Sequence, residues 1–180
     1  MSVPIHRREA SQFEVFFHLI QLRKDITDLL LRDFGYSLSK AEKALLKQLG
    51  GESYEELTDI QKERYDKTKH RNEAFHAWYI YDMRKSIVDA LRDIQTCVYV
   101  ANSIFPYYME ELIERRIWQD KAIGHCNRLL QELDYAIQTL PVDINVYTRF
   151  AKSIKHEISL IKGWRKSDNK FVNKIKSGNP

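Results

Sequence analysis

The sequence predicts an all-α protein: an antiparallel, up-and-down four-helix bundle with a charged insertion between its first two helices. Apolar residues recur at alternating spacings of three and four in several separate stretches, which is the period of helices that pack along a seam. No stretch alternates apolar and polar residues as a half-buried strand does. Only 6 of the 180 residues are Gly and 4 are Pro, so long uninterrupted helices are possible. Together these features favour a bundle.

The first predicted helix runs from about Ser11 to Phe34. Ser11 and Glu14, three residues later, match a capping box, and Gly35 is a suitable stop. The apolar face of this helix is broader than a surface helix needs. Arg23 interrupts that face. Either its long stem carries the charge to solvent or to a carboxylate, or it marks an interface.

Residues 36–74 differ in composition and form the predicted insertion. Ser39 is a suitable cap for a short helix through Leu49, which two glycines follow. The stretch 53–73 is rich in charge and poor in aliphatic residues. We expect it to be either helical through Glu–Lys pairs or mobile, and in neither case buried.

The second predicted helix runs from about Phe75 to Ile104, with an extension backward into the insertion as an alternative. Pro106 disfavours helical geometry at the residue before it and so marks the break. The apolar seam of this helix consists of Ile80, Met83, Ile87, Ala90, Ile94, Cys97, Ala101 and Ile104.

The third predicted helix runs from about Tyr107 to Leu140, and its apolar seam is Ile123, Cys126, Leu130, Leu133, Ile137 and Leu140. Projected backward, this seam meets two polar residues, Gln119 and Arg116. Arg116 either reaches solvent or a carboxylate such as Glu114 or Asp120, or it sets helix register at an interface.

The fourth predicted helix begins at Ile144, after Pro141 ends the third and Asp143 provides an N-cap. So short a join predicts that helices three and four are antiparallel neighbours. The seam of the fourth helix is Ile144, Tyr147, Ala151, Ile154, Ile158 and Ile161. We therefore expect one bundle domain over residues 1–166, followed by a basic tail over residues 167–180.

Positive charge is concentrated at the C-terminal end. From Arg149 onward there are nine Lys and Arg residues and two acidic residues, whereas residues 1–148 carry a slight negative charge. Beside the apolar seam, about 100° round the fourth helix, lies a row made of Lys152, Lys155, Ser159, Lys162 and Lys166. Clustered cations without nearby acids are typical of phosphate binding, although charged helix faces often serve only solubility.

Signatures of catalysis are lacking in the sequence, so we expect a protein that is not an enzyme and needs no cofactor. It contains no phosphate-binding glycine loop, no zinc-protease motif and no nucleophile elbow. A di-metal site would need Glu-x-x-His pairs on bundle helices, and none occurs there, so we expect no metal. His18, His70, His76 and His125 are interpreted as surface or boundary residues.

Cys97 and Cys126 both fall on apolar seams and are expected to be reduced core residues. The chain has no long apolar run and no signal-peptide pattern at its N-terminus. We therefore expect a cytoplasmic protein that does not enter a membrane.

Aromatic residues are more numerous than one core can hold. Trp78, Tyr79 and Tyr81 lie on nearly consecutive positions and must point in different directions round a helix. A similar surplus is formed by Phe105, Tyr107, Tyr108 and Trp118. Either the insertion folds over these rings or another subunit covers them, which would make the protein an oligomer.

Three segments resemble a known family. They are RKSIVDALRDIQTCVYVANSI (84–104), RRIWQDKAIGHCNRLLQELDYAIQTL (115–140) and ISLIKGWRKS (158–167). The chain resembles the accessory variability determinant (Avd) proteins of bacterial diversity-generating retroelements, and the related bundle proteins encoded in intervening sequences of 23S ribosomal RNA. The similarity covers about half of the chain and leaves out residues 36–74.

The resemblance implies a homopentamer that binds the retroelement's reverse transcriptase and its template RNA or cDNA, and that supports mutagenic copying without catalysing it. The nucleic-acid-binding positions that it implies in this chain are Arg149, Lys152, Lys155, Lys162, Arg165 and Lys166, with Arg115, Arg116 and Arg128 as weaker candidates. A protein-interaction adaptor that binds no nucleic acid remains the alternative, and a bundle metalloenzyme is a third hypothesis.

Overall fold

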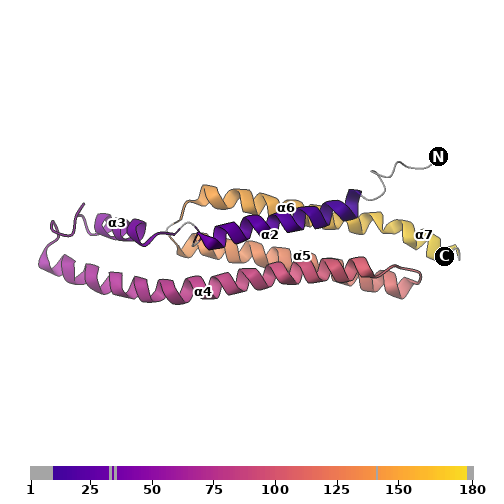
Figure 1. The fold of residues 1–180 in the computed structure, drawn as a ribbon, viewed down its shortest axis with the longest axis horizontal. Helices are drawn as coiled ribbons and strands as arrows, with labels where there is room; N and C mark the ends of the chain where they lie inside the picture. Colours follow the sequence, from indigo (N-terminus) through magenta and orange to yellow (C-terminus); the bar gives the residue numbers. More distant parts are fainter. Residues whose placement is uncertain (1–9, 33, 35, 141, 178–180) are drawn as a thin grey trace.

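The computed structural model describes residues 10–177, except residues 33, 35 and 141 (Figure 1). No strand occurs among these residues. The helices are α2 (Ala10–Leu31), α3 (Leu38–Gln48), α4 (Asp59–Ser103), α5 (Met109–Thr139), α6 (Ile144–Ser167) and α7 (Asn169–Lys176). The predicted all-helical class is confirmed.

The long helices α2, α4, α5 and α6 lie lengthwise beside one another, and α3 lies against the N-terminal part of α4 (Figure 1). Contacts join α4 to α5, α5 to α6, α6 to α2, and α2 to α4. The four helices bury one shared hydrophobic core. In the part of the chain that the structure describes, no helix is long and apolar enough to cross a membrane.

Helix α4 is continuous from the insertion into the core, as the alternative prediction stated. It contains 45 residues, so it is about 67 Å long. It begins with a capping box in which Thr58 and Gln61 each bond the other's backbone N–H. The predicted seam from Ile80 to Ala101 is buried, and the helix ends at Ser103.

Helix α3 begins two residues earlier than predicted. Its N-cap is Ser37, and Ser39 lies inside the helix, so that predicted cap is wrong. The helix ends at Gln48, one residue before the predicted end, and Leu49 is its C-cap. Gly50 follows with φ of +85°, a conformation that costs glycine little, and the N–H of Gly51 bonds the carbonyl of Leu46 at 3.1 Å. The glycine pair therefore reverses the chain towards α4.

The insertion has a small hydrophobic core of its own. Leu45 of α3 packs with Leu57 and Tyr65, all three of which are buried. The expectation that the stretch 53–73 buries nothing is therefore wrong. Although the stretch contributes only Leu57 and Tyr65, these two side chains pack with Leu45 and join α3 to α4. We call this part of the molecule, residues 36–75, the arm.

Helix α2 differs from its prediction at both ends. Ser11 lies within the helix and so is not its cap, and the helix ends at Leu31, before Phe34. Phe34 is buried with φ of +60°. Arg23 is half-buried and donates to the side-chain oxygen of Gln95, which is an amide partner and not a carboxylate. Gly35 and Pro141, the two predicted helix ends, lie outside the described residues.

The buried faces of α5 and α6 match the predicted seams in part. The predicted core residues Cys126, Leu133, Leu140, Tyr147, Ile154 and Ile161 are buried, whereas the seam residues between them lie one position away from the buried row. In α5 the buried row is Leu112, Arg115, Gln119, Ala122, Cys126, Leu129, Leu133 and Ala136. In α6 it is Tyr147, Phe150, Ile154, Glu157, Ile161 and Trp164. Gln119 is buried as predicted, but Arg115 takes the core position expected for Arg116.

The residues after Ser167, predicted to form a basic tail, are helical through Lys176. Helix α7 contacts α5, and the ring of Phe171 lies 5.5 Å from that of Phe105. Asp168, at the junction of α6 and α7, is buried. The C-terminal basic residues are therefore carried on a helix that packs against the bundle.

Candidate nucleic-acid interface

Four lysines form an exposed row along α6. Lys152, Lys155, Lys162 and Lys166 are all exposed, on the side of the helix away from its buried row. None of them forms an ion pair with any residue that the structure describes. We call these four residues the lysine row. Its positive charge is not balanced by neighbouring acids.

A shallow hollow of about 270 Å³ adjoins the C-terminal end of the lysine row. It is lined by Arg116, Lys162, Arg165, Lys166 and Asn169. Arg116 donates to the side-chain oxygen of Asn169 at 2.7 Å, while its Nε is buried and has no hydrogen-bond partner. Arg165 pairs with Asp120. Besides Lys162 and Lys166 of the lysine row, two further cationic side chains, those of Arg116 and Arg165, therefore line the hollow, and an unsatisfied donor lies beside it.

Arg115, a weaker candidate, does not lie on this surface. It is 2% exposed, and its Nε donates to Asp168 at 2.8 Å. Gln119 donates to the same carboxylate at 2.8 Å, and Arg115 also donates to the carbonyl of Ile104 at 2.8 Å. The guanidinium lies 4.9 Å from the Trp164 ring. We therefore assign Arg115 a structural role at the junction of α6 and α7 instead of a nucleic-acid contact.

Arg128 and Arg149 lie apart from the hollow. Arg128 is 3.5 Å from Asp93 and donates to the hydroxyl of Ser86 at 3.2 Å, so its charge is already partly balanced. Arg149 is exposed at the other end of α6, where its guanidinium lies 4.5 Å from the ring of Phe150. The structure thus groups the α6 lysines with Arg116 and Arg165, and it does not bring Arg128 to them.

A buried polar cluster joins α2 to α6, at residues that the sequence pattern does not single out. Glu157 is 0% exposed, and one of its oxygens lies 2.5 Å from Nδ1 of His18. The other ring nitrogen of His18 lies 3.2 Å from the hydroxyl of Ser153, and the His156 ring packs edge-on at 4.7 Å. Burial raises the pKa of Glu157 to about 8. Burial, with a smaller contribution from His156, lowers the pKa of His18.

These two pKa shifts favour a neutral pair at neutral pH. The protonated Glu157 then donates to His18, and His18 donates to Ser153. One signal could have revealed Glu157: it lies three residues after Ile154 and four before Ile161, both of which are buried. His18 is half-buried, so its predicted place at the boundary of the core is confirmed, and it is also the partner of a core carboxylic acid.

Metal ligands do not gather in the described part of the chain, where no group of three or more His, Cys, Asp or Glu residues could hold an ion. Cys97 and Cys126 are buried and unpaired, as predicted. Burial raises the pKa of both thiols. Both cysteines therefore act as apolar core residues.

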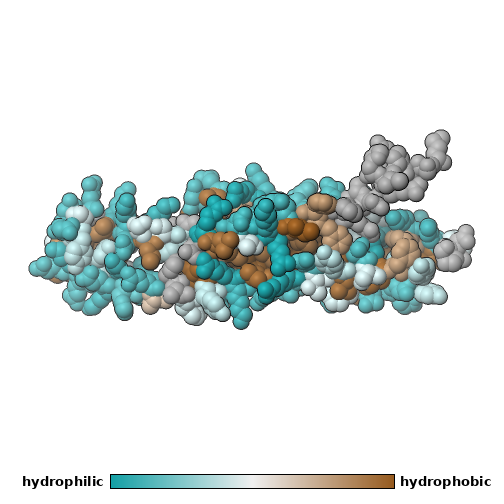
Figure 2. Space-filling view, viewed as in Figure 1, coloured by the Kyte–Doolittle hydropathy of each residue, from teal (hydrophilic) through white to brown (hydrophobic). Residues whose placement is uncertain are grey.

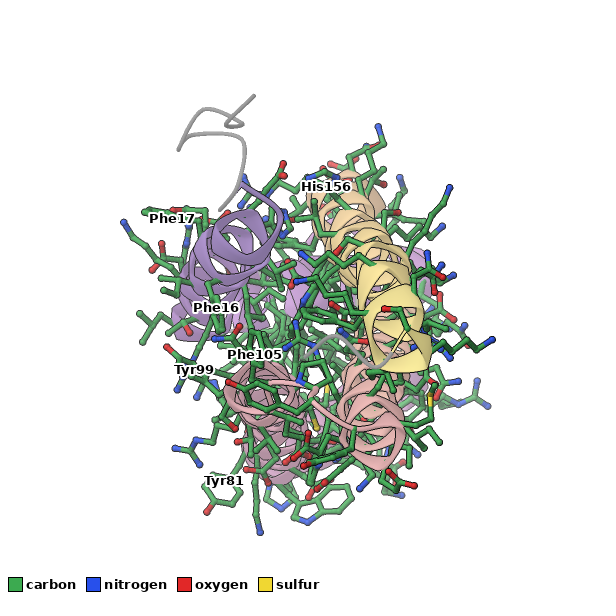
Figure 3. The ribbon with its side chains drawn as sticks, turned by 90° about the vertical axis from the view of Figure 1, so that its right-hand side faces the viewer. Phe16, Phe17, Tyr81, Tyr99, Phe105 and His156 are labelled. Carbon is green, nitrogen blue, oxygen red and sulfur yellow. The ribbon has the colours of Figure 1, made fainter. Side chains whose placement is uncertain are left out.

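Exposed aromatic and aliphatic side chains remain on several faces. Tyr79 is buried, whereas Trp78 and Tyr81 are exposed, so the three rings do diverge as predicted. Figure 3 shows Tyr81 pointing outward from α4, while Phe16 and Tyr99 meet between α2 and α4. Apolar side chains also gather over the middle of the molecule in Figure 2, where Figure 1 places α2. Of the two alternatives for these rings, cover by the arm is not seen at Trp78 or Tyr81.

Comparison with known proteins found no relative. No family model matches the chain, and no curated protein and no solved structure matches it. The functional proposal therefore depends on the geometry of the basic surface and on the sequence resemblance.

Proposed function

We propose that the protein is a non-enzymatic accessory factor that binds nucleic acid through the lysine row and the adjoining hollow. In this proposal its ligand is the template RNA or cDNA of a retroelement reverse transcriptase, with which it associates in the bacterial cytoplasm. The single observation that carries the proposal is the row of four exposed lysines with no acidic partner among the described residues. The reverse transcriptase is proposed as a partner because of the resemblance to the accessory variability determinant family.

The fold proposed for this function is an antiparallel four-helix bundle. The closed circuit of contacts among α2, α4, α5 and α6 supports it, as does the short join between α5 and α6. In such a bundle the buried face of α6 is occupied by the core, so its lysine face is turned to solvent. An amphipathic helix of this kind cannot also insert its apolar face into a membrane.

The dimensions of the lysine row suit a nucleic-acid strand. Lys152 and Lys166 are 14 positions apart, which is about 21 Å along a helix. A stacked strand advances about 3.4 Å per nucleotide, so the row covers about six phosphates. Nothing in the row selects a base, because lysine contacts phosphates as a point charge. Binding is expected to depend on charge and to weaken with salt.

The test is salt-dependent binding by a variant in which Lys152, Lys155, Lys162 and Lys166 are all changed to Gln. Loss of four phosphate contacts should reduce the slope of log K against log salt by about 3 for single strands. The matched control changes Lys24, Lys40, Lys43 and Lys85 to Gln, four exposed lysines on other helices. Equal slopes for the two variants would show that the lysine row is not the binding surface.

A protein-interaction adaptor is the second candidate, and the exposed rings of Trp78, Tyr81, Phe105, Tyr107 and Tyr108 favour it. The resemblance implies a homopentamer, in which neighbouring subunits would cover such rings. Sedimentation at several salt concentrations measures the mass of the assembly. A monomer at all salt concentrations would contradict an oligomeric accessory factor and an oligomeric adaptor alike. An oligomer that does not depend on salt and binds no nucleic acid would favour the adaptor.

The retroelement assignment has its own test. The protein should co-purify with a reverse transcriptase encoded beside its gene, and the same locus should contain a repeated template region. A gene with neither neighbour would remove the basis for this partner while leaving nucleic-acid binding to be measured.

A further inference from the structure

A groove between α3 and α4 forms a second polar surface, on the arm. Two adjoining hollows of about 350 and 450 Å³ share Leu45, Gln48, Thr68 and Arg71 as lining residues. The first continues towards the core as far as Phe75, and the second continues along α4 to Arg64. The groove therefore follows α4 for 11 positions, which is about 16 Å.

Helix α4 lines this groove with a single stripe of side chains. Arg64, Thr68, Arg71 and Phe75 recur at spacings of four, three and four, which places them on one face of the helix. Lys67 also lines the groove. The stripe thus combines two guanidinium groups, a hydroxyl and an aromatic ring in a single line.

Two acidic residues of the arm are paired with lysines. Glu63 accepts from Lys67 at 2.7 Å, and Glu42 pairs with Lys69 at 2.9 Å. Arg64 and Arg71 form no ion pair with any residue within the described ranges. The arm as a whole carries equal numbers of basic and acidic residues. The groove is nevertheless positive, because its two arginines have no acidic partner.

Small residues on α3 keep the groove open. Ala41 and Ala44 line the first hollow, and neither has a side chain beyond Cβ to fill it. Gln48 lies on the same side of α3 and lines both hollows. Its side-chain amide both donates and accepts hydrogen bonds, so it can meet a polar edge of a ligand.

The end of the groove nearest the core presents a preorganised ring. Phe75 stacks on Tyr79 with centroids 4.7 Å apart and planes inclined by 16°. Tyr79 is buried, and its hydroxyl is bonded to that of Thr139 at 2.5 Å. The Phe75 ring is still 44% exposed. A ring held in this way can stack on a ligand without losing much conformational freedom.

We propose that this groove is a second binding site for single-stranded nucleic acid, separate from the lysine row. Arg64 and Arg71 contact phosphates, a base stacks on Phe75, and Gln48 and Thr68 meet polar groups between them. A cationic groove combined with an aromatic platform is the arrangement that binds single strands without sequence preference. About 16 Å of groove accommodates about five stacked nucleotides. The proposal extends the proposed function to a new surface.

The test measures binding of fluorescein-labelled oligouridine and oligothymidine, each of about 12 nucleotides, to the full chain by fluorescence anisotropy. Changing both Arg64 and Arg71 to Gln should reduce the slope of log K against log salt by about 1.4, since each phosphate contact contributes about 0.7. The matched control changes Lys40 and Lys43 to Gln, two exposed residues of α3 that do not line the groove.

A second variant tests the groove without a change in charge. Ala44→Phe fills the first hollow from an exposed position of α3, so the fold should be retained, which circular dichroism checks. Its affinity for both oligonucleotides should fall several-fold. If the arginine variant and Ala44→Phe both bind like the control, the groove is not a nucleic-acid site.

These measurements test the lysine row and the groove independently of each other. Loss of binding in the lysine-row variant, with normal binding in the groove variants, would overturn the inference and leave the proposed function intact. The reverse pattern would support the groove and overturn the lysine row. A preference of the lysine-row variant for one of the two oligonucleotides shows whether the groove favours RNA or DNA.

Discussion

The buried Glu157 should make the protein less stable as the pH rises, and Glu157→Gln should remove this effect. Burial raises the pKa of Glu157 from 4.5 to about 8. Between those two values the folded state binds more protons than the unfolded state, so the free energy of unfolding falls with increasing pH. Each pH unit in this interval lowers the free energy of unfolding by about 1.4 kcal/mol, so the loss at pH 7 is about 3 kcal/mol.

Glutamine has nearly the same shape as protonated glutamic acid and carries no charge. Its amide can donate to His18 as the carboxylic acid does, so the variant keeps the contact and avoids the ionisation. We expect Glu157→Gln to be more stable than the wild type by about 3 kcal/mol at pH 7. The difference should disappear near pH 4.5 and should be largest above pH 8.

The assay is urea denaturation of both proteins at intervals from pH 4.5 to pH 9, with the exposed Glu14→Gln as a control on α2. His18 contributes in the opposite direction. Its pKa is lowered, so its contribution to stability is present above its ordinary value of 6.5 and is lost as the pH falls. That contribution is common to both proteins. A Glu157→Gln variant less stable than the wild type at pH 7 would refute the reasoning, because it would show an ionised Glu157 paired with a protonated His18.

Two other predictions concern the core. Asp168→Asn leaves the buried Arg115 without its charged partner and should reduce the free energy of unfolding by about 3 kcal/mol or more, measured by urea denaturation. Hydrogen exchange should then show faster opening of α7, and unchanged protection there would contradict the structural role of this pair. Cys97 and Cys126 should react with a thiol reagent only as fast as the protein unfolds, because both are buried with raised pKa values. Rapid labelling of the native protein would disprove their core positions.

The positions of the long helices could be predicted well from the sequence. The buried faces of α5 and α6 were predicted less well. In α4 the core positions from Ile80 to Ala101 are all apolar, so the apolar pattern alone locates the buried row. In α5 and α6 the core includes Arg115 and Glu157. A seam drawn through apolar residues avoids such positions, so it keeps some core residues and takes others from the adjacent row. Their partners, Asp168 and His18, are 53 and 139 residues away in the chain, a separation that no local pattern can bridge.

The candidate site, too, could be predicted from the sequence only in part. The lysine row could be predicted, because it depends only on the period of one helix and on the local excess of cations. The hollow beside it could not, because Arg116 reaches Asn169 through packing of α5 against α7. The groove on the arm was also missed, since its charge is hidden in a segment with equal numbers of acids and bases. Local composition therefore predicts a surface on one helix but not a surface shared by two.

The continuity of α4 fixes the spacing between the two proposed binding surfaces. From Arg71, in the groove, to Ser103, near α7, the helix advances about 48 Å, and no proline or glycine interrupts it. A rod of this kind has no hinge at which the arm could swing towards the bundle. A nucleic acid bound at both the groove and the hollow must therefore bridge a constant interval. Oligonucleotide length, and not sequence, would then decide whether one molecule engages one surface or both.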